Sequence, residues 1–242
     1  MGIKISEMLL GTLISYALLA ALATALLVAA VTDLRRREID NWLNAAIALG
    51  APLYWLAAGL DWVAMGFQVA LALVTFLAAC ILFALRQMGG GDVKLLTVLA
   101  LWFVPGSFAQ VIVIMAVIGG AASIGMAVFN MRRVPTETLR NALSTAVAAL
   151  WVTVACLLVY GAATGRPALD PASARVITGV LPVGWQLALL SIVLLAVCTL
   201  GMRHIFRRQR GAIPIPYGVA ISAAALWVLG QTILTGPAAG VA

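Results

Sequence analysis

Two aspartates stand where long apolar segments of this 242-residue chain begin or end. Asp33 closes one segment in AAVTDLRRREIDN, and Asp92 opens another in MGGGDVKLL. When two carboxyl groups lie close together in a poorly solvated site, one stays protonated while the other acts as a base. Such a pair can activate water against a peptide carbonyl and protonate the leaving nitrogen, with no metal or other cofactor. The residue types therefore suggest an aspartyl dyad.

The glycines before Asp92 suit the same chemistry. Gly89 and Gly91 flank a third glycine, and glycine lets a chain turn and a substrate backbone approach closely. Irregular backbone at membrane depth occurs only where it lines a cavity or is buried in protein. A plain loop or a helix-packing role explains the glycines equally well. A phosphate-binding loop is disfavoured, because GGGDVK lacks the required spacing and the terminal Lys-Ser/Thr pair.

The composition decides which solvent surrounds these acids. Hydrophobic residues make up 64% of the chain and charged residues 10%, and the mean hydropathy is +1.11. This leaves too little polar material to coat a soluble protein, so we expect a polytopic protein of the lipid bilayer. The net charge of +7 comes from short basic clusters between apolar runs, which argues against a nucleic-acid partner. The three cysteines form no C-x-x-C pair, so no metal site is expected.

The apolar runs predict an all-α fold of about eight transmembrane helices in a single integral membrane domain, residues 1–242. A hydrocarbon core about 30 Å thick requires about 20 apolar residues of helix. The runs are continuous and rich in Ala and Leu, unlike the alternating strands of a barrel. The first run is too long for a secretory signal and is expected to remain as a helix. The expected spans are 8–31, 41–60, 62–85, a short one at 93–107 interrupted by proline and glycine, 109–131, 142–164, 183–202 and 213–236.

This arrangement brings the two aspartates to the same side of the membrane. Two complete spans, 41–60 and 62–85, separate Asp33 from Asp92, so both carboxyls return to one face and a similar depth. Twelve of the fifteen Lys and Arg residues fall in loops on that face, and three fall on the other. The positive-inside rule then makes that face cytoplasmic and leaves both termini outside the cytoplasm. Residues 165–184, on the outer side, are expected to form an irregular connector.

The GGGD stretch resembles the GxGD motif of the type IV prepilin peptidases, which are bacterial inner-membrane aspartyl proteases. Gly89, Gly91 and Asp92 supply the motif, and Lys94 stands where that family commonly has lysine. The resemblance implies that Asp92 is one of the two catalytic acids. Lys94 would either tune Asp92 or act as an ordinary interfacial lysine.

Two further segments are similar to the same family. DLRRREIDN, from Asp33 to Asn41, resembles the segment of the first catalytic aspartate, although Asp40 replaces the usual proline. Asn41 would either hydrogen-bond this segment or cap the second span. IPIPYGVAIS, from Ile213, resembles the start of the last helix of the family, where proline suits a helix start.

The resemblance implies a function as well as a fold. Residues 8–131 and 213–236 would form the peptidase helices, and residues 142–202 would be additional helices. The substrates would be prepilins or pseudopilins, cut on the cytoplasmic side behind a short basic leader. The chain lacks the paired C-x-x-C domain of larger members and is similar to the compact peptidases of Flp, or tight-adherence, pili, so methyltransferase activity is not implied. Two other classes stay open: a transporter or channel using paired acids, and a structural membrane subunit.

Overall fold

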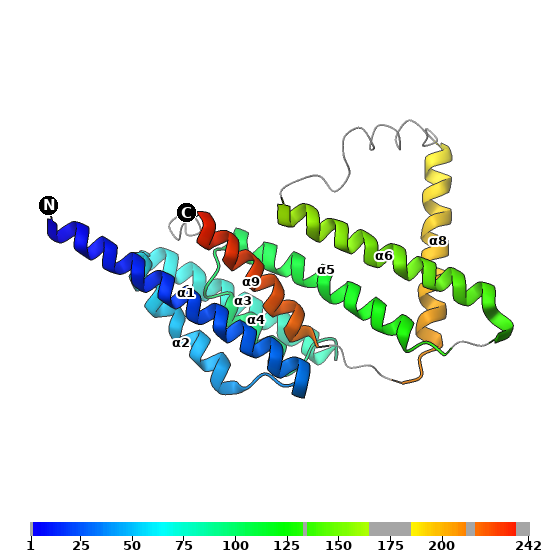
Figure 1. Ribbon diagram of the computed structural model, residues 1–242, viewed down its shortest axis with the longest axis horizontal. Helices are drawn as coiled ribbons and strands as arrows, with labels where there is room; N and C mark the ends of the chain where they lie inside the picture. Colours follow the sequence, from blue (N-terminus) through cyan, green and yellow to red (C-terminus); the bar gives the residue numbers. More distant parts are fainter. Residues whose placement is uncertain (1, 133–134, 165–184, 212–215, 236–242) are drawn as a thin grey trace. The chain divides into compact units, whose positions relative to one another are not determined.

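The computed structural model describes residues 2–132, 135–164, 185–211 and 216–235 (Figure 1). In these residues the regular elements are helices, with no strand and one isolated bridge between Met131 and Gln209. The all-helical prediction is therefore confirmed for this part of the chain. The connector predicted at 165–184 lies outside the described residues. The helices are α1 (Gly2–Arg36), α2 (Asn41–Ala58), α3 (Trp62–Ala84), α4 (Gly90–Leu99), α5 (Pro105–Phe129), the 3-10 turn η1 (Pro135–Glu137), α6 (Thr138–Thr164), α8 (Trp185–Arg207) and α9 (Tyr217–Thr235).

Five helical segments of the described chain are long and apolar enough to cross a membrane. They are Leu9–Arg36, Trp62–Ala84, Pro105–Phe129, Pro135–Gly161 and Tyr217–Leu234. Large apolar side chains along them are exposed, as lipid-facing helices require. The chain is thus a multi-pass membrane protein, while the count of eight spans stays a prediction.

The boundary between the fourth and fifth helices differs from the prediction. The expected span 93–107 is too long: α4 has ten residues and ends at Leu99, and Pro105 begins α5. Proline has no N–H and a fixed φ, so it fits the first turn of a helix, where the N–H has no partner in any case. Pro105 is therefore a start signal and not an interruption.

The chain forms two compact units, Met1–Ala116 with Pro216–Ala242, and Val117–Ile215. In the first unit, α1 packs against α2 and α9, and α4 packs against α2, α3 and α9 (Figure 1). The buried face of α1 repeats at helical spacing through Leu19, Leu22, Leu26 and Ala29. This packing brings the end of α1, the start of α4 and the start of α9 together.

Aromatic contacts fix α4 relative to α2. The indole N–H of Trp102 donates to the Ile47 carbonyl at 2.9 Å, and that of Trp55 donates to Leu101 at 2.8 Å. The rings of Tyr54 and Trp102 stack with centroids 5.4 Å apart. Buried indole N–H groups need such partners, so these bonds favour one register of the two helices.

In the second unit, α6 packs against α8. Ala127, Met131, Ala148 and Ile205 form its buried apolar cluster. The side-chain amide of Gln209 closes this cluster by donating to the carbonyls of Ala127 at 2.9 Å and Ile205 at 2.7 Å.

Candidate active site

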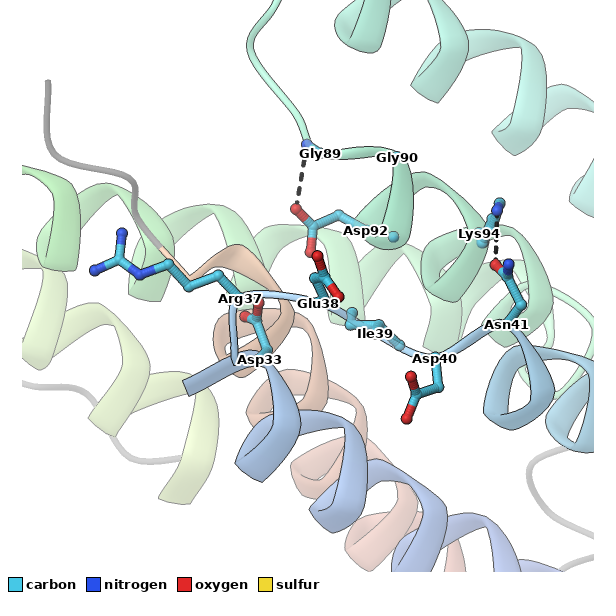
Figure 2. A pocket seen from close by; sticks show the side chains of 11 residues that line it. Asp33, Arg37, Glu38, Ile39, Asp40, Asn41, Gly89, Gly90, Asp92 and Lys94 are labelled. Atoms are coloured by element: carbon cyan, nitrogen blue, oxygen red, sulfur yellow. Dashed lines mark hydrogen bonds between the residues drawn. The ribbon is translucent and has the colours of Figure 1, made fainter. Parts of the chain in front are cut away.

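A cavity of about 390 Å³ lies where α1 ends and α4 begins, and both predicted aspartates line it. Figure 2 shows Asp33 on the last turn of α1 and Asp92 on the first turn of α4. Asp33 is 5% exposed and Asp92 8% exposed, although charged side chains are rarely so buried. The remaining lining is the segment from Arg37 to Asn41, the glycines 89–91 and Lys94.

Asp33 is held by the start of α9. Its Oδ2 accepts a hydrogen bond from the Val219 N–H at 3.1 Å. The first N–H groups of a helix have no intrahelical partner and favour negative charge, so a carboxyl group suits this place. A Cβ on Gly218 would lie 2.7 Å from Asp33 Oδ2 and 2.9 Å from its Cγ. Only glycine lets α9 approach this closely.

Asp92 is held in the same way by its own helix. It is the third residue of α4, and its Oδ2 accepts from the Gly89 N–H at 3.3 Å (Figure 2). A Cβ on Gly89 would lie 3.0 Å from that oxygen. Gly89 has φ −75°, and Gly90 and Gly91 are helical, so none of the three serves to turn the backbone. Space beside the carboxyl group is what glycine provides here.

The electrostatic environment of Asp92 suits a proton carrier. Asp92 lies outside the five candidate spans. Its pKa is raised from 3.8 to about 6, mainly by burial and further by the charge of Asp33, while the hydrogen bond from the Gly89 N–H opposes the rise. The influence of Asp33 places the two carboxyl groups within electrostatic range of each other.

The segment between α1 and α2 completes the wall. The Arg37 N–H donates to the Asp33 carbonyl at 2.9 Å, and Arg37 has a left-handed φ of 58°, which ends α1. Ile39, 7% exposed, then reaches between two helices. Its Cβ would lie 3.4 Å from a Cβ on Gly91, and its Cδ1 2.8 Å from one on Gly218. Ile39 thus spaces the starts of α4 and α9.

The structure gives Lys94 and Asn41 one shared role. Lys94 Nζ donates to Asn41 Oδ1 at 2.7 Å, which links α4 to the start of α2 (Figure 2). Asn41 is the first residue of α2, and the preceding Asp40 is the N-cap, without a side-chain capping bond. Asp40 has φ −61° and ψ 139°, a conformation that a proline, with its φ fixed near −65°, could also adopt.

The segment that follows Ile213 belongs to the candidate site, which the sequence did not predict. The sequence predicted only a helix start there, whereas Gly218 and the Val219 N–H contact Asp33 directly. The Pro-Tyr-Gly pattern was the available signal. In the described residues no three His, Cys, Asp or Glu side chains gather as metal ligands.

Comparison with known proteins identifies one family. The model of the type IV leader peptidase family matches residues 20–124, a stretch that contains both aspartates, the three glycines, Asn41 and Lys94. It contains neither Gly218 nor helices α6 and α8. No curated protein and no solved structure shows significant similarity to the chain. The match of residues 20–124 to the type IV leader peptidase family supports the resemblance found in the sequence.

Proposed function

We propose that the chain is an aspartyl endopeptidase that cuts the leader peptides of type IV prepilins or pseudopilins. The observation that carries the proposal is the pair of buried acids, Asp33 and Asp92, lining one cavity from different helices. The leader peptidase family of residues 20–124 implies a peptidase.

The chemistry follows from two carboxyl groups that share a proton. The raised pKa of Asp92 makes it the group from which we expect the proton on the substrate carbonyl to come. The other carboxyl takes a proton from the attacking water, and the roles reverse when the peptide nitrogen leaves. Because the charge of Asp33 contributes to the raised pKa of Asp92, the protonation of one acid depends on the other.

The cavity also offers acids beyond the dyad. Glu38 and Asp40 lie on its wall beside the two aspartates. A basic leader peptide would be attracted to this face, since opposite charges speed association and fix orientation. We propose that the leader peptide of a prepilin occupies this cavity and that the prepilin is of the Flp type.

The membrane placement is part of the same proposal. By the positive-inside rule, the split of twelve Lys and Arg residues against three supports a cytoplasmic location for the C-terminal end of α1 and the start of α4 in a bacterial inner membrane, with both termini outside. Residues 8–131 and 213–236 would form the peptidase, and residues 142–202 would add helices to it. Supporting this division, Gly218 and Val219 contact Asp33 although the family match ends at residue 124.

The test is cleavage of a co-expressed prepilin with a basic leader and a glycine cleavage site. Wild type is compared with Asp33→Asn and Asp92→Asn at matched membrane abundance. Asp61→Asn is the control, because Asp61 caps α3 by accepting from the Ala64 N–H at 2.7 Å, and asparagine caps equally well. We expect cleavage by wild type and the control only. Cleavage by both Asp33→Asn and Asp92→Asn would rule out the aspartyl dyad and favour a transporter or a structural subunit.

A further inference from the structure

A second cavity, of about 460 Å³, lies between α6 and α8, two helices that the family match does not reach. Its volume falls in the range of about 300–1,000 Å³ typical of small-molecule sites. The lining comes from one face of each helix. It consists of Arg140, Leu143, Ser144 and Val147 from α6, and Val197, Leu200, Gly201, Arg203, His204, Arg207 and Arg208 from α8 or just beyond its end.

One end of this cavity is strongly basic. Four of the lining residues are arginines, and none is acidic. Glu137 contacts two of them from outside the lining, Arg208 at 2.9 Å and Arg140 at 3.8 Å. In the described part of the chain no carboxylate lies within ion-pair distance of Arg203 or Arg207, and both are exposed. One glutamate against four arginines leaves an excess of positive charge.

The other end of the cavity is apolar. Along α6 the lining changes from Arg140 through Leu143 to Val147, and along α8 it changes from Arg207 back through Leu200 to Val197. With a rise of about 1.5 Å per residue, the polar and apolar ends are roughly 10–15 Å apart. The cavity is therefore amphipathic along the helix axes.

The helices come into close contact beside the apolar lining, and polar contacts hold the basic end. A Cβ on Gly201 would lie 3.3 Å from Val147 Cβ, so glycine permits the close approach of α8 to α6. His204 Nε2 lies 3.0 Å from Asn141 Oδ1, which ties the ring of His204 to α6. The site is thus formed by the helix pair and not by mobile surface arginines alone.

We propose that this cavity binds the phosphate headgroup of an anionic phospholipid. Arginine pairs with phosphate oxygens through two parallel hydrogen bonds, and basic pockets between membrane helices accept anionic headgroups. A free phosphate would match the arginines but leave the leucines and valines without a partner. A lipid matches both ends, because its acyl chains lie along the apolar residues of α6, one of the candidate spans. The site is independent of the peptidase activity.

The test measures lipid binding to the purified full chain in detergent by native mass spectrometry. The probes are phosphatidylglycerol and phosphatidylcholine with identical acyl chains, and glycerol 3-phosphate is added as a soluble competitor. The variant is Arg203→Gln with Arg207→Gln. The control is Arg35→Gln with Arg36→Gln, which removes the same charge from exposed residues of α1 that line neither cavity.

We expect wild type and the control to bind phosphatidylglycerol equally, and the Arg203/Arg207 variant to bind it at least about tenfold more weakly, through loss of charge-assisted hydrogen bonds. Phosphatidylcholine should bind more weakly to all three proteins. Equal binding of both lipids, or an equal loss in the control variant, would overturn the proposal. Displacement of the lipid by equimolar glycerol 3-phosphate would overturn the assignment to a lipid.

Discussion

Replacing Asp92 by asparagine should stabilise the folded protein while abolishing the proposed cleavage. Asp92 is 8% exposed and its pKa is raised to about 6 from 3.8, mainly by burial. The folded state therefore binds this proton more tightly than the unfolded state does. As pH rises through the window from 3.8 to about 6, the free energy of unfolding falls, and it stays lowered above that window.

The magnitude follows from the shift. A difference of about 2 pKa units, at about 1.4 kcal/mol per unit, gives about 3 kcal/mol of destabilisation at neutral pH. Asparagine carries no charge to bury, and its side-chain oxygen can still accept from the Gly89 N–H. For a chain of this size, about 3 kcal/mol corresponds to a rise in Tm of roughly 6–12 °C. Part of the gain should disappear in an Asp33→Asn background, because the charge of Asp33 contributes to the raised pKa.

The assay is thermal unfolding of purified wild type and Asp92→Asn in detergent, at about pH 8 and about pH 4. At about pH 4 the difference should shrink below about 1 kcal/mol, since the carboxyl is then largely protonated in the folded state and partly in the unfolded state. Asp61→Asn, at an exposed N-cap, should show no comparable gain. Destabilisation by Asp92→Asn, or an equal gain at both pH values, would refute the reasoning. A stable but inactive variant would also rule out misfolding as the cause of lost cleavage.

Three further substitutions test the geometry of the site. Gly218→Ala should reduce prepilin cleavage at least about tenfold, because the new Cβ would lie 2.7 Å from a carboxyl oxygen of Asp33. The control is Gly230→Ala in the same helix, whose Cβ would meet nothing within 4 Å, so this variant should retain cleavage. Asp40→Pro should gain about 0.5 kcal/mol of stability in thermal unfolding, since the φ of Asp40 is already −61°. A loss of stability would show that the Asp40 N–H is needed. Lys94→Gln should leave the acid limb of the pH–rate profile of cleavage unchanged, because burial and the charge of Asp33, and not Lys94, raise the pKa of Asp92. A shift of that limb would show that Lys94 influences the titration of Asp92.

The sequence predicted the helices well where polar residues mark their ends. The expected spans 41–60 and 62–85 correspond to α2 and α3. Gly59 ends α2 in a left-handed conformation at φ 74°, and Asp61 caps α3. The predicted end of the fourth helix is wrong because the chain stays apolar from Leu99 to Pro105 and beyond, although α4 ends at Leu99 and α5 begins at Pro105.

The two aspartates could be predicted because depth in a membrane follows from counting spans. The two spans predicted between Asp33 and Asp92, 41–60 and 62–85, would return both to one side, whatever the packing of the helices. The contact with α9 could not be predicted in this way. Val219 lies 186 positions from Asp33, and its N–H reaches that carboxyl only because α9 packs on α1. Hydropathy identifies helices but carries no information on which of them are neighbours.

Gly218 and Gly89 leave space for the carboxyl groups of the site, and neither is needed to turn the backbone. Each aspartate accepts a backbone N–H at the start of a helix, Asp33 from α9 and Asp92 from α4. A Cβ on Gly218 or Gly89 would lie 3.0 Å or less from the bound oxygen. A side chain at either position would push the carboxyl away from the backbone and toward solvent. Since burial is the largest cause of the raised pKa of Asp92, the absence of a side chain on Gly89 helps to keep a protonatable acid in the cavity near neutral pH.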